Sequence, residues 1–525
     1  MMPILKAQNL AYTLPTGDIL FQSVSVTMTS PRVGLVGKNG CGKSILAAML
    51  SGARKPKAGH VACEFRTAMY TQQPGQWLHE GATIADLLGI TPVIDAIAQI
   101  VDGDCHPQLF ETVGDRWDIV ESVSARLAAL GLPQDCQTKC ASLSGGELAK
   151  LRLWQLFNAD HQLLILDEPS NHLDAQSRDW LARQIRHTDA AVLLISHDRQ
   201  LLEDMQEIWA LSSSGIRVYG GNYSHYAEQK FFDEQALERQ LNALNKQQQQ
   251  LQRQIQRDHE KAQQRAVQGQ KQRGSQAKCL LDSQKDRATA GASNRSKNAQ
   301  ARQRQLQQKT DKLRAAKVPQ RQQAIYLASA QTSRKQVISV VQGRLAFGSE
   351  QRINLQVAAN EKIHLQGSNG SGKSTLLKSI QGQIPLKQGE LTVSSPLYYL
   401  DQHFSIVVPV QSLLDNLLSS CDGLTEADAR TILAGIGFRR DRVYTMAGEL
   451  SGGEKMKLAM LIVSHQSATQ SGQPFLLLDE PDNHLDLDSK ILLAQALNQH
   501  QGGFILISHD TLFAREAGCS QAYVM

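Results

Sequence analysis

Two glycine-rich segments of this chain carry the residue types that bind the phosphate groups of a nucleotide. Residues 37–44 read GKNGCGKS and residues 367–374 read GSNGSGKS. In each segment, glycines permit a tight turn whose backbone N–H groups and following helix N-terminus bind phosphate oxygens. The lysine contacts the phosphates as a point charge, and the last serine offers a hydroxyl ligand to Mg²⁺. The candidate nucleotide-binding residues are Gly37, Lys38, Asn39, Gly40, Cys41, Gly42, Lys43, Ser44, Gly367, Ser368, Asn369, Gly370, Ser371, Gly372, Lys373 and Ser374.

An acidic pair ends an apolar run downstream of each glycine-rich segment. Asp167 and Glu168 follow the run LLIL, and Asp479 and Glu480 follow LLL. Such a run predicts a buried parallel strand, and the aspartate at its end is placed to bind Mg²⁺, directly or through water. The glutamate, one residue later, is placed to orient an attacking water as a general base. The structural alternative is an acidic pair that caps the following turn.

A histidine and a glutamine complete each predicted reaction centre. His197 and His509 each follow the aspartate by 30 residues, which favours a sensor of the γ-phosphate over a lone surface histidine. Gln73 and Gln402 follow a tyrosine and fit a position that contacts the metal and the water. The choice of Gln73 over Gln72 rests on aligning YTQQ with YLDQ. The catalytic candidates are Glu168, His197, Glu480 and His509, and the metal-ligand candidates are Ser44, Gln73, Asp167, Ser374, Gln402 and Asp479.

The motif LSGGE also occurs twice, at residues 143–147 and 450–454. A serine and two glycines that open a helix form a further phosphate-binding N-terminus. This motif has no reacting group of its own, so we expect each copy to contact the nucleotide of the other module. Residues 37–44 would then pair with Ser451, and residues 367–374 with Ser144. The binding candidates in this motif are Ser144, Gly145, Gly146, Ser451, Gly452 and Gly453.

Two aromatic residues lie upstream of the glycine-rich segments. Tyr12 precedes Gly37 by 25 residues, and Phe347 precedes Gly367 by 20. Either aromatic ring could stack on adenine in a bound nucleotide. An ordinary core aromatic remains the alternative for both positions.

The same motifs recur in the same order over residues 4–227 and 336–525, together with NHLD and LISHD in each copy. An internal repeat of this kind indicates two modules of one fold. The apolar runs predict buried parallel strands, so the expected fold is α/β with a P-loop core and a helical subdomain. We expect domains at 1–227 and 331–525 and a linker at 228–330. About 23 extra residues in the first module, within 80–120, predict a contact element or an elaborated helical subdomain.

Composition narrows the class of protein. No apolar run approaches the roughly 18 residues that cross a bilayer, and the N-terminal residues show no signal peptide pattern. The eight cysteines are scattered without a CxxC pair, which argues against a zinc site and favours reduced thiols in the cytoplasm. The net charge of +5 conceals twenty Lys and Arg against five Asp and Glu within residues 239–321, a local balance of +15.

This basic segment has the pattern of a helical hairpin. Leu237, Leu241, Leu244, Leu251 and Ile255 fall at alternating steps of four and three residues, with Gln248 filling one place. This spacing predicts a helix with one narrow apolar seam. A weaker heptad continues downstream, so we expect an antiparallel hairpin with its tip near residues 266–298. A rigid, solvated spacer is the simpler interpretation. Neutralisation of nucleic-acid phosphates explains the excess of +15 better.

The quoted motifs closely resemble those of the ATP-binding-cassette (ABC) superfamily, across both modules. Within it, the chain resembles the ABC-F subfamily of soluble tandem-cassette proteins, on the basis of NHLD in both modules and YGGNYSHY at 219–226. The resemblance implies ATP hydrolysis with Mg²⁺ in a monomer whose cassettes pair within one chain. It also implies that the linker engages the ribosome, through rRNA or tRNA, in a translation factor or an antibiotic-resistance protein. Ser170 and Asp482 depart from the usual threonine before NHLD.

Two other functions fit parts of this pattern. One is the ATPase subunit of an ABC transporter, which would need a separate membrane protein and no basic hairpin. The other is a DNA-binding ABC ATPase, for which the basic hairpin would bind DNA. The complete cassettes argue against a repair ATPase with a split cassette, and the lack of CxxC pairs argues against a zinc-bearing excision ATPase.

Overall fold

The computed structural model describes residues 3–14, 17, 19–71, 81–171, 173–212, 215–271, 301–311, 313, 336–421, 423–468, 475–483 and 485–525. The chain divides into two compact units. One unit comprises Met1–Tyr223 and Gln323–Met525, and it contains both cassettes. The other is Ser224–Gln322. Within the described residues, no helix is long and apolar enough to cross a membrane.

The first cassette is built on a mainly parallel sheet with strand order β5-β6-β7-β3-β8-β9. Only the β8–β9 pair is antiparallel. The strands are β3 (Arg32–Gly37), β5 (Thr67–Tyr70), β6 (Leu163–Asp167), β7 (Ala191–Ile195), β8 (Glu207–Ser212) and β9 (Gly215–Gly220). All five residues of β6 and of β7 are buried, as expected for a strand covered on both faces. The apolar run before Asp167 is therefore a fully buried strand of this sheet, between β5 and β7.

A second, antiparallel sheet of the first cassette has the order β2-β1-β4. It consists of β1 (Leu5–Thr13), β2 (Ile19–Met28) and β4 (Ala58–Ala62). The helix α1 (Lys43–Leu50) contributes Leu46, Ala47 and Leu50 to one apolar core that also includes residues of both sheets. The glycine-rich segment thus joins β3 to a helix that is fixed between two sheets.

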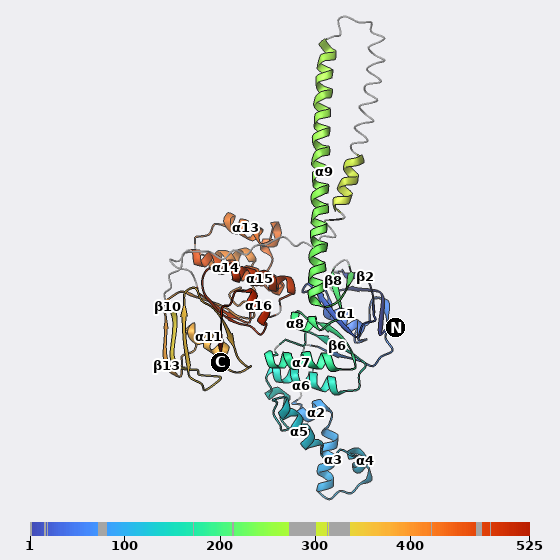
Figure 1. Cartoon of the computed structure of the whole chain (residues 1–525), viewed down its shortest axis with the longest axis vertical. Coiled ribbons are helices and arrows are strands. Elements are labelled where there is room, and N and C mark those ends of the chain that lie inside the picture. The colour runs from blue at the N-terminus through green and yellow to red at the C-terminus, as the bar shows by residue number, and fades with distance from the viewer. Residues whose placement is uncertain are drawn as a thin grey trace. The chain divides into compact units, whose positions relative to one another are not determined.

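The second cassette repeats this arrangement. Its parallel sheet has the order β14-β15-β16-β12-β17, and its antiparallel sheet the order β11-β10-β13. Figure 1 shows α11 (Lys373–Ile380) between these sheets, and its apolar residues share one core with both. The strands are β10 (Gln336–Arg344), β11 (Ile353–Ala358), β12 (Lys362–Gln366), β13 (Gln388–Val393), β14 (Leu397–Leu400), β15 (Phe475–Asp479), β16 (Phe504–Ile507) and β17 (Gln521–Val524).

Each cassette also has a helical subdomain that carries LSGGE. In the first it comprises α2 (Ile84–Leu88), α3 (Thr91–Val101), α4 (Pro107–Val113), α5 (Ile119–Ala129), η2 (Cys140–Ser142) and α6 (Gly145–Asn158). In the second it comprises α12 (Leu413–Ser420), α13 (Glu426–Gly435), η3 (Arg440–Tyr444), η4 (Ala447–Glu449) and α14 (Gly452–Ala468). The bridges Thr83–Lys139 and Ser412–Met446 match the start of α2 to that of α12. The pair α3 and α4 therefore accounts for the additional residues of the first cassette.

In each cassette, one helix follows the acidic pair and another follows the histidine. They are α7 (Ala175–His187) and α8 (Arg199–Glu203) in the first, and α15 (Leu487–Gln499) and α16 (Thr511–Glu516) in the second. Asp174 and Asp486 cap α7 and α15 by accepting a hydrogen bond at 2.9 Å from the backbone N–H three residues later. The last residue of each NHLD motif is thus a helix cap.

The middle of the chain is helical. The long helix α9 (Tyr223–Lys271) and the helical residues 301–311 contact one another within the second unit. Gln248 of α9 donates a hydrogen bond to Oγ1 of Thr310 at 3.1 Å, and Thr310 is fully buried. Contacts of this kind require two helical segments side by side, as predicted. The predicted tip, near 266–298, falls largely outside the described residues.

Candidate nucleotide-binding sites

The first glycine-rich segment encloses the side chain of its own lysine. Lys43, which is only 8% exposed, donates from Nζ to the carbonyl oxygens of Gly37 at 2.8 Å and Lys38 at 3.2 Å. Gly42 has a left-handed backbone with φ 94°, and a Cβ atom there would lie 2.3 Å from Leu20. The left-handed backbone therefore favours glycine at this position, and any larger residue would also have to displace the side chain of Leu20. The loop holds a positive charge at a helix N-terminus, as phosphate binding requires.

The second segment has the same geometry. Lys373 donates to the carbonyl oxygens of Gly367 at 2.8 Å and Ser368 at 2.9 Å. Gly372 has φ 99°, and a Cβ atom there would lie 3.0 Å from the carbonyl oxygen of Phe347. The close approach of this backbone again requires glycine. It also places residue 347 directly beside the glycine-rich segment.

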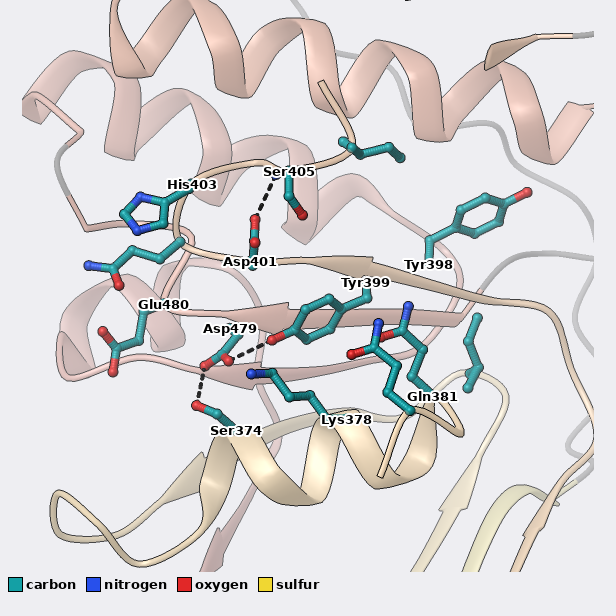
Figure 2. Close-up of a pocket in the computed structure, with 14 residues that line it drawn as sticks. Ser374, Lys378, Gln381, Tyr398, Tyr399, Asp401, His403, Ser405, Asp479 and Glu480 are labelled. Atoms are coloured by element: carbon teal, nitrogen blue, oxygen red, sulfur yellow. Dashed lines mark hydrogen bonds between the residues drawn. The ribbon is translucent and has the colours of Figure 1, made fainter. Parts of the chain in front are cut away.

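The aspartate that ends β15 meets the serine of the second segment, as Figure 2 shows. Ser374 donates from Oγ to Oδ1 of Asp479 at 3.0 Å, and Tyr399 donates from Oη to Oδ2 at 2.8 Å. Burial raises the pKa of Tyr399, so the phenol stays protonated and acts as the donor. These three residues, together with Gln402 and Glu480, line a cavity of about 690 Å³.

The carboxylate oxygens of Asp167 and Asp479 are ligands that suit Mg²⁺. Ser44 forms a hydrogen bond with Asp167, whose Oδ1 atom is buried without a hydrogen-bond partner in the described part of the chain. Burial raises the pKa of Asp167 and of Asp479, and a bound cation would favour their ionised forms. Among the described residues, no group of three or more His, Cys, Asp or Glu could hold a metal. Mg²⁺ needs no such group, because it takes one or two carboxylates with substrate phosphates and water.

The glutamate of each acidic pair has a backbone conformation that is uncommon for a residue with a side chain. The φ angle is 48° at Glu168 and 51° at Glu480. Glu168 lies 3.6 Å from Nε2 of His197, and Glu480 lies 3.4 Å from Nε2 of His509. The fold thus brings each predicted general base next to the predicted γ-phosphate sensor of the same cassette. Strained backbone of this kind is characteristic of functional sites.

The two glutamates differ in acidity. Burial raises the pKa of Glu168 to about 7. Burial also raises the pKa of Glu480, but the hydrogen bond and charge of His509 and the charge of Lys373 outweigh it, so this pKa lies below its usual value. Burial holds the pKa of His197 well below its usual value, so this imidazole is neutral near pH 7. The two sites are therefore electrostatically different.

Each LSGGE motif forms the exposed N-terminus of a helix. Ser144 accepts a hydrogen bond from the backbone of Glu147 at 3.3 Å and donates its own N–H to that carboxylate at 2.8 Å. Ser451 and Glu454 form the same reciprocal pair at 3.4 Å and 3.1 Å. This capping box fixes the first turn, and other N–H groups of that turn remain available to an anion.

The glycine-rich segment of each cassette contacts the NHLD aspartate of the other. The N–H of Asn39 donates to Oδ2 of Asp486 at 3.3 Å. In the opposite direction, Asp174 accepts a hydrogen bond from the backbone of Asn369. These reciprocal contacts place a segment of each cassette at the phosphate-binding loop of its neighbour.

The two predicted adenine-stacking residues lie in different surroundings. Tyr12 accepts a hydrogen bond from Arg54 at 2.9 Å and lies 6.4 Å from the ring of Phe21. Phe347 is 70% exposed and adjoins the second glycine-rich segment. The ring of Phe347 is thus available for stacking, whereas Tyr12 is engaged by residues of its own cassette.

The predicted metal ligand Gln73 and its alternative Gln72 lie outside the described residues.

Some residues of the observed sites were not predicted from the sequence. Tyr399 and the two NHLD aspartates were not among the predicted site residues. The aspartates could have been found from NHLD, whose last residue recurs in both modules, but their contacts with the other cassette have no local signal. Tyr399 entered the sequence analysis only as the tyrosine that precedes Gln402, and no role was predicted for it.

Two modules with this loop, acidic pair and histidine define a tandem P-loop ATPase. A family model described as ABC transporter matches residues 21–171 and 350–483, more than half of the chain. The chain therefore belongs to the ABC transporter family of ATP-binding proteins and, within it, to the ABC-F subfamily. Members of the family bind ATP, generally with Mg²⁺, and the chain is an ATPase.

The relatives match over nearly the whole chain. ABC transporter F family member 5 of Arabidopsis thaliana is 28% identical over 542 residues, which cover 94% of this chain and 72% of that protein. A probable ATP-binding protein YheS of Haemophilus influenzae is 29% identical over 523 residues, with 94% and 74% covered. The solved archaeal ribosome recycling factor aABCE1, in complex with the ribosomal stalk protein aP1, has a TM-score of 0.56 and 17% identity. The matched region covers 98% of this chain and 87% of the aABCE1 chain, and this similarity confirms the tandem-cassette fold.

Proposed function

We propose that the chain is an ATP-driven clamp that binds ATP between its two cassettes and acts on the ribosome. The contact that carries the first half of this proposal is the hydrogen bond from Asn39 to Asp486. It puts a residue of the second cassette at the phosphate-binding loop of the first. A ligand bound there would contact both cassettes, so its binding favours their closed arrangement.

The second cassette also brings its LSGGE helix toward the same loop. Lys457 of α14 is close enough to Lys38 for the two charges to interact, and it lies one helical turn beyond Glu454. The exposed N-terminus at Ser451 belongs to this helix. These contacts support an ATP site formed by residues 37–44 with Ser451. By the pseudo-symmetry of the fold, residues 367–374 would pair with Ser144.

The residues in place have defined tasks in ATP hydrolysis. Lys43 and Lys373 would bind phosphate oxygens, and Ser44 with Asp167, or Ser374 with Asp479, would hold Mg²⁺. The bound Mg²⁺ would neutralise phosphate charge. Each glutamate would accept a proton from the attacking water, and the adjacent histidine would contact the γ-phosphate. Burial of these groups strengthens the electrostatic interactions among them.

The ribosome is proposed as the target because of the charge in the middle of the chain. Residues 239–321 have a balance of +15, and the described arginines on the two helical segments are exposed, among them Arg253, Arg257, Arg302 and Arg304. A thin, extended helical element with this charge is suited to rRNA or tRNA phosphates. Membership of the ABC-F subfamily supports the same target, and so does the fold shared with a ribosome recycling factor.

Two roles on the ribosome are compatible with these features. A translation factor would alter peptide synthesis without a drug, whereas a resistance protein would restore synthesis in the presence of a ribosome-binding antibiotic. A translation assay with and without each drug class separates them. The basic segment serves both roles equally, because it binds phosphates regardless of the drug.

Co-sedimentation tests the ribosomal target. The Glu168→Gln/Glu480→Gln variant, which should bind ATP without hydrolysing it, is mixed with purified ribosomes and either ATP or no nucleotide. We expect ribosome binding that depends on ATP. Recovery with duplex DNA and no recovery with ribosomes would replace the ribosome by DNA as the target. Recovery independent of ATP would contradict the clamp.

A further inference from the structure

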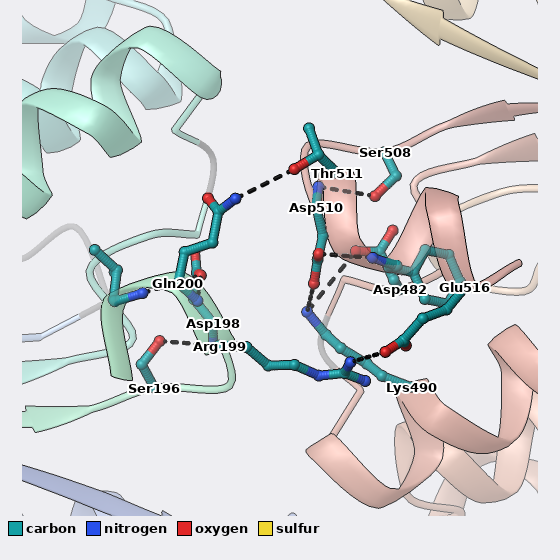
Figure 3. Close-up of polar contacts among 12 residues, drawn as sticks. Ser196, Asp198, Arg199, Gln200, Asp482, Lys490, Ser508, Asp510, Thr511 and Glu516 are labelled. Carbon is teal, nitrogen blue, oxygen red and sulfur yellow. Dashed lines mark hydrogen bonds and ion pairs between the residues drawn. The ribbon is translucent and has the colours of Figure 1, made fainter. Parts of the chain in front are cut away.

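An ion pair joins the cassettes beside the two catalytic histidine loops. Arg199, the first residue of α8, donates from Nη1 to Oε1 of Glu516, the last residue of α16, at 2.6 Å (Figure 3). The adjacent Gln200 donates to Oγ1 of Thr511 at 3.2 Å. The side chain of Arg199 is only 7% exposed. A guanidinium group in this position is shielded from water by contact with the other cassette.

This ion pair is one-sided, although the two cassettes repeat one fold. Thr511 of the second cassette stands where Arg199 stands in the first, because each directly follows the His-Asp pair. Asp204 corresponds to Glu516, and it pairs with Arg186 of its own cassette at 3.3 Å. The NHLD contacts, in contrast, occur in both directions. The Arg199–Glu516 ion pair is therefore a contact between the cassettes that exists in one direction only.

The charged residues around the Arg199–Glu516 pair explain why the arginine comes from the first cassette and the carboxylate from the second. In the second cassette, Lys490 lies 3.8 Å from Asp482 and 3.6 Å from Asp510, so one lysine serves two buried carboxylates (Figure 3). Ser170, which is uncharged, takes the place of Asp482 in the first cassette. The guanidinium of Arg199 faces the carboxylates of Glu516 and Asp510, whose charges raise its pKa against the effect of burial, so it complements negative charge on the second cassette.

Apart from Glu516, the guanidinium of Arg199 has few groups in the described part of the chain to bind to. Its Nε and Nη2 atoms are buried without hydrogen-bond partners in the described part of the chain. Burial by itself would lower the pKa of Arg199, but the hydrogen bond with Glu516 and the charge of Asp510 raise it overall. Loss of Glu516 would leave a cation buried with much less compensation, which favours separation of the cassettes and hydration of the arginine.

We propose that Arg199 is a positioning residue that, through Glu516, stabilises the closed arrangement of the two cassettes and so sets the ATP concentration at which they close. The inference rests on the clamp proposed above. In the part of the chain that the structure describes, the ion-pair partner of Arg199 is Glu516, which is not one of the nucleotide-binding candidates. It lies two residues after His197, and Thr511, which contacts its neighbour Gln200, lies two residues after His509. The pair therefore ties the histidine loops of the two sites together.

The test measures cassette closure directly. A dye on each cassette of the Glu168→Gln/Glu480→Gln protein reports closure by energy transfer during an ATP titration. We expect Arg199→Gln and Glu516→Gln each to raise the half-closing ATP concentration roughly tenfold, the effect of losing one charge-assisted hydrogen bond. The double change should be no worse than the worse single change.

The control is Arg186→Gln, which removes an ion pair within one cassette and should leave the closing concentration unchanged. The melting temperature without nucleotide verifies that each variant is folded. If the parent protein closes with ATP but the Arg199 and Glu516 variants close at the same concentration, the inference is wrong. Multiplicative effects of the two single changes would also overturn it. If the parent does not close at all, the clamp itself is contradicted.

Discussion

The backbone N–H of Asn39 donates a hydrogen bond to Oδ2 of Asp486, 447 positions along the chain, at 3.3 Å. Asp486 also caps α15 through the N–H of Ser489 at 2.9 Å. One carboxylate therefore joins the phosphate-binding loop of the first cassette to a helix of the second.

Replacing Asp486 by asparagine should separate its role as the cap of α15 from its contact with Asn39. Asn caps helices as well as Asp does, so Asp486→Asn should change the melting temperature by less than roughly 2 °C. The contact with Asn39 loses its charge, and we expect the ATPase rate to fall roughly three- to tenfold. Steady-state phosphate release gives the rate. Asp102→Asn, at an exposed position outside the sites, is the matched control. An unchanged rate in Asp486→Asn would show that the cross-cassette contact has no role in turnover.

The paired substitution Glu168→Gln with Glu480→Gln should abolish hydrolysis and preserve ATP binding. The amide keeps the shape of the carboxylate but cannot accept the proton, and loss of a general base lowers rates by roughly 10²- to 10⁴-fold. Single-turnover phosphate release and equilibrium binding of ATP measure the two properties separately. A rate near that of the unaltered protein would exclude both glutamates as the base.

Much of each site could be predicted from the sequence, because its chemistry lies in contiguous motifs. The glycine-rich segments and LSGGE form a loop and a helix start from their own residues, and apolar runs identified β6 and β15. The tandem-cassette fold and the helical middle region are confirmed. Assignments of individual residues to ATP or Mg²⁺ remain predictions.

Contacts between distant segments could not be predicted in the same way. Tyr399 reaches Asp479 only because β14 and β15 pair in parallel, with this tyrosine one position before the strand end. The Arg199–Glu516 pair depends on how two cassettes meet, and a single sequence has no local signal for that. Tyr12 and Phe347 occupied equivalent places in the motif order, yet different neighbours surround them.

Two glycines of the first phosphate-binding loop should differ in their tolerance of a side chain. Gly40 and Gly42 both have positive φ, at 78° and 94°, but a Cβ atom at Gly40 meets nothing within 4 Å. At Gly42 it would lie 2.3 Å from Leu20. We expect Gly40→Ala to cost about 1 kcal/mol in the free energy of unfolding, from backbone strain alone. Gly42→Ala should cost more, by roughly 1–3 kcal/mol, because the core must also shift.

Denaturant unfolding without nucleotide measures this difference, so phosphate contacts do not enter. Equal costs for the two substitutions would mean that the loop relaxes freely away from Leu20. That result would contradict the close packing of α1 between the two sheets.

Charge reversal in the middle of the chain should weaken ribosome binding and leave basal hydrolysis unchanged. The variant changes Arg253, Arg257, Arg302 and Arg304 to Glu, all of them exposed. Each lost phosphate contact should reduce the slope of log affinity against log salt by roughly 0.7–0.9. Ribosome binding at several salt concentrations gives this slope, and phosphate release gives the basal rate.

The matched control reverses four exposed basic residues of the cassettes, which are Lys55, Lys57, Lys387 and Arg439. It should retain the salt slope of the unaltered protein. An unchanged affinity and slope in the helical variant would make the middle of the chain a spacer. The helices α3 and α4 would then be the next candidate for the ribosome contact.

The central claim, that each ATP is bound by both cassettes, is tested most directly by site-resolved labelling. Ser144→Arg and Ser451→Arg proteins are photolabelled with an azido-ATP, and the labelled peptides are assigned to one loop or the other. A bulky cation at either helix N-terminus opposes the closed site, so Ser451→Arg should lower labelling at residues 37–44 and spare residues 367–374. Ser144→Arg should do the reverse. If each serine instead affects labelling only in its own cassette, the composite sites are wrong.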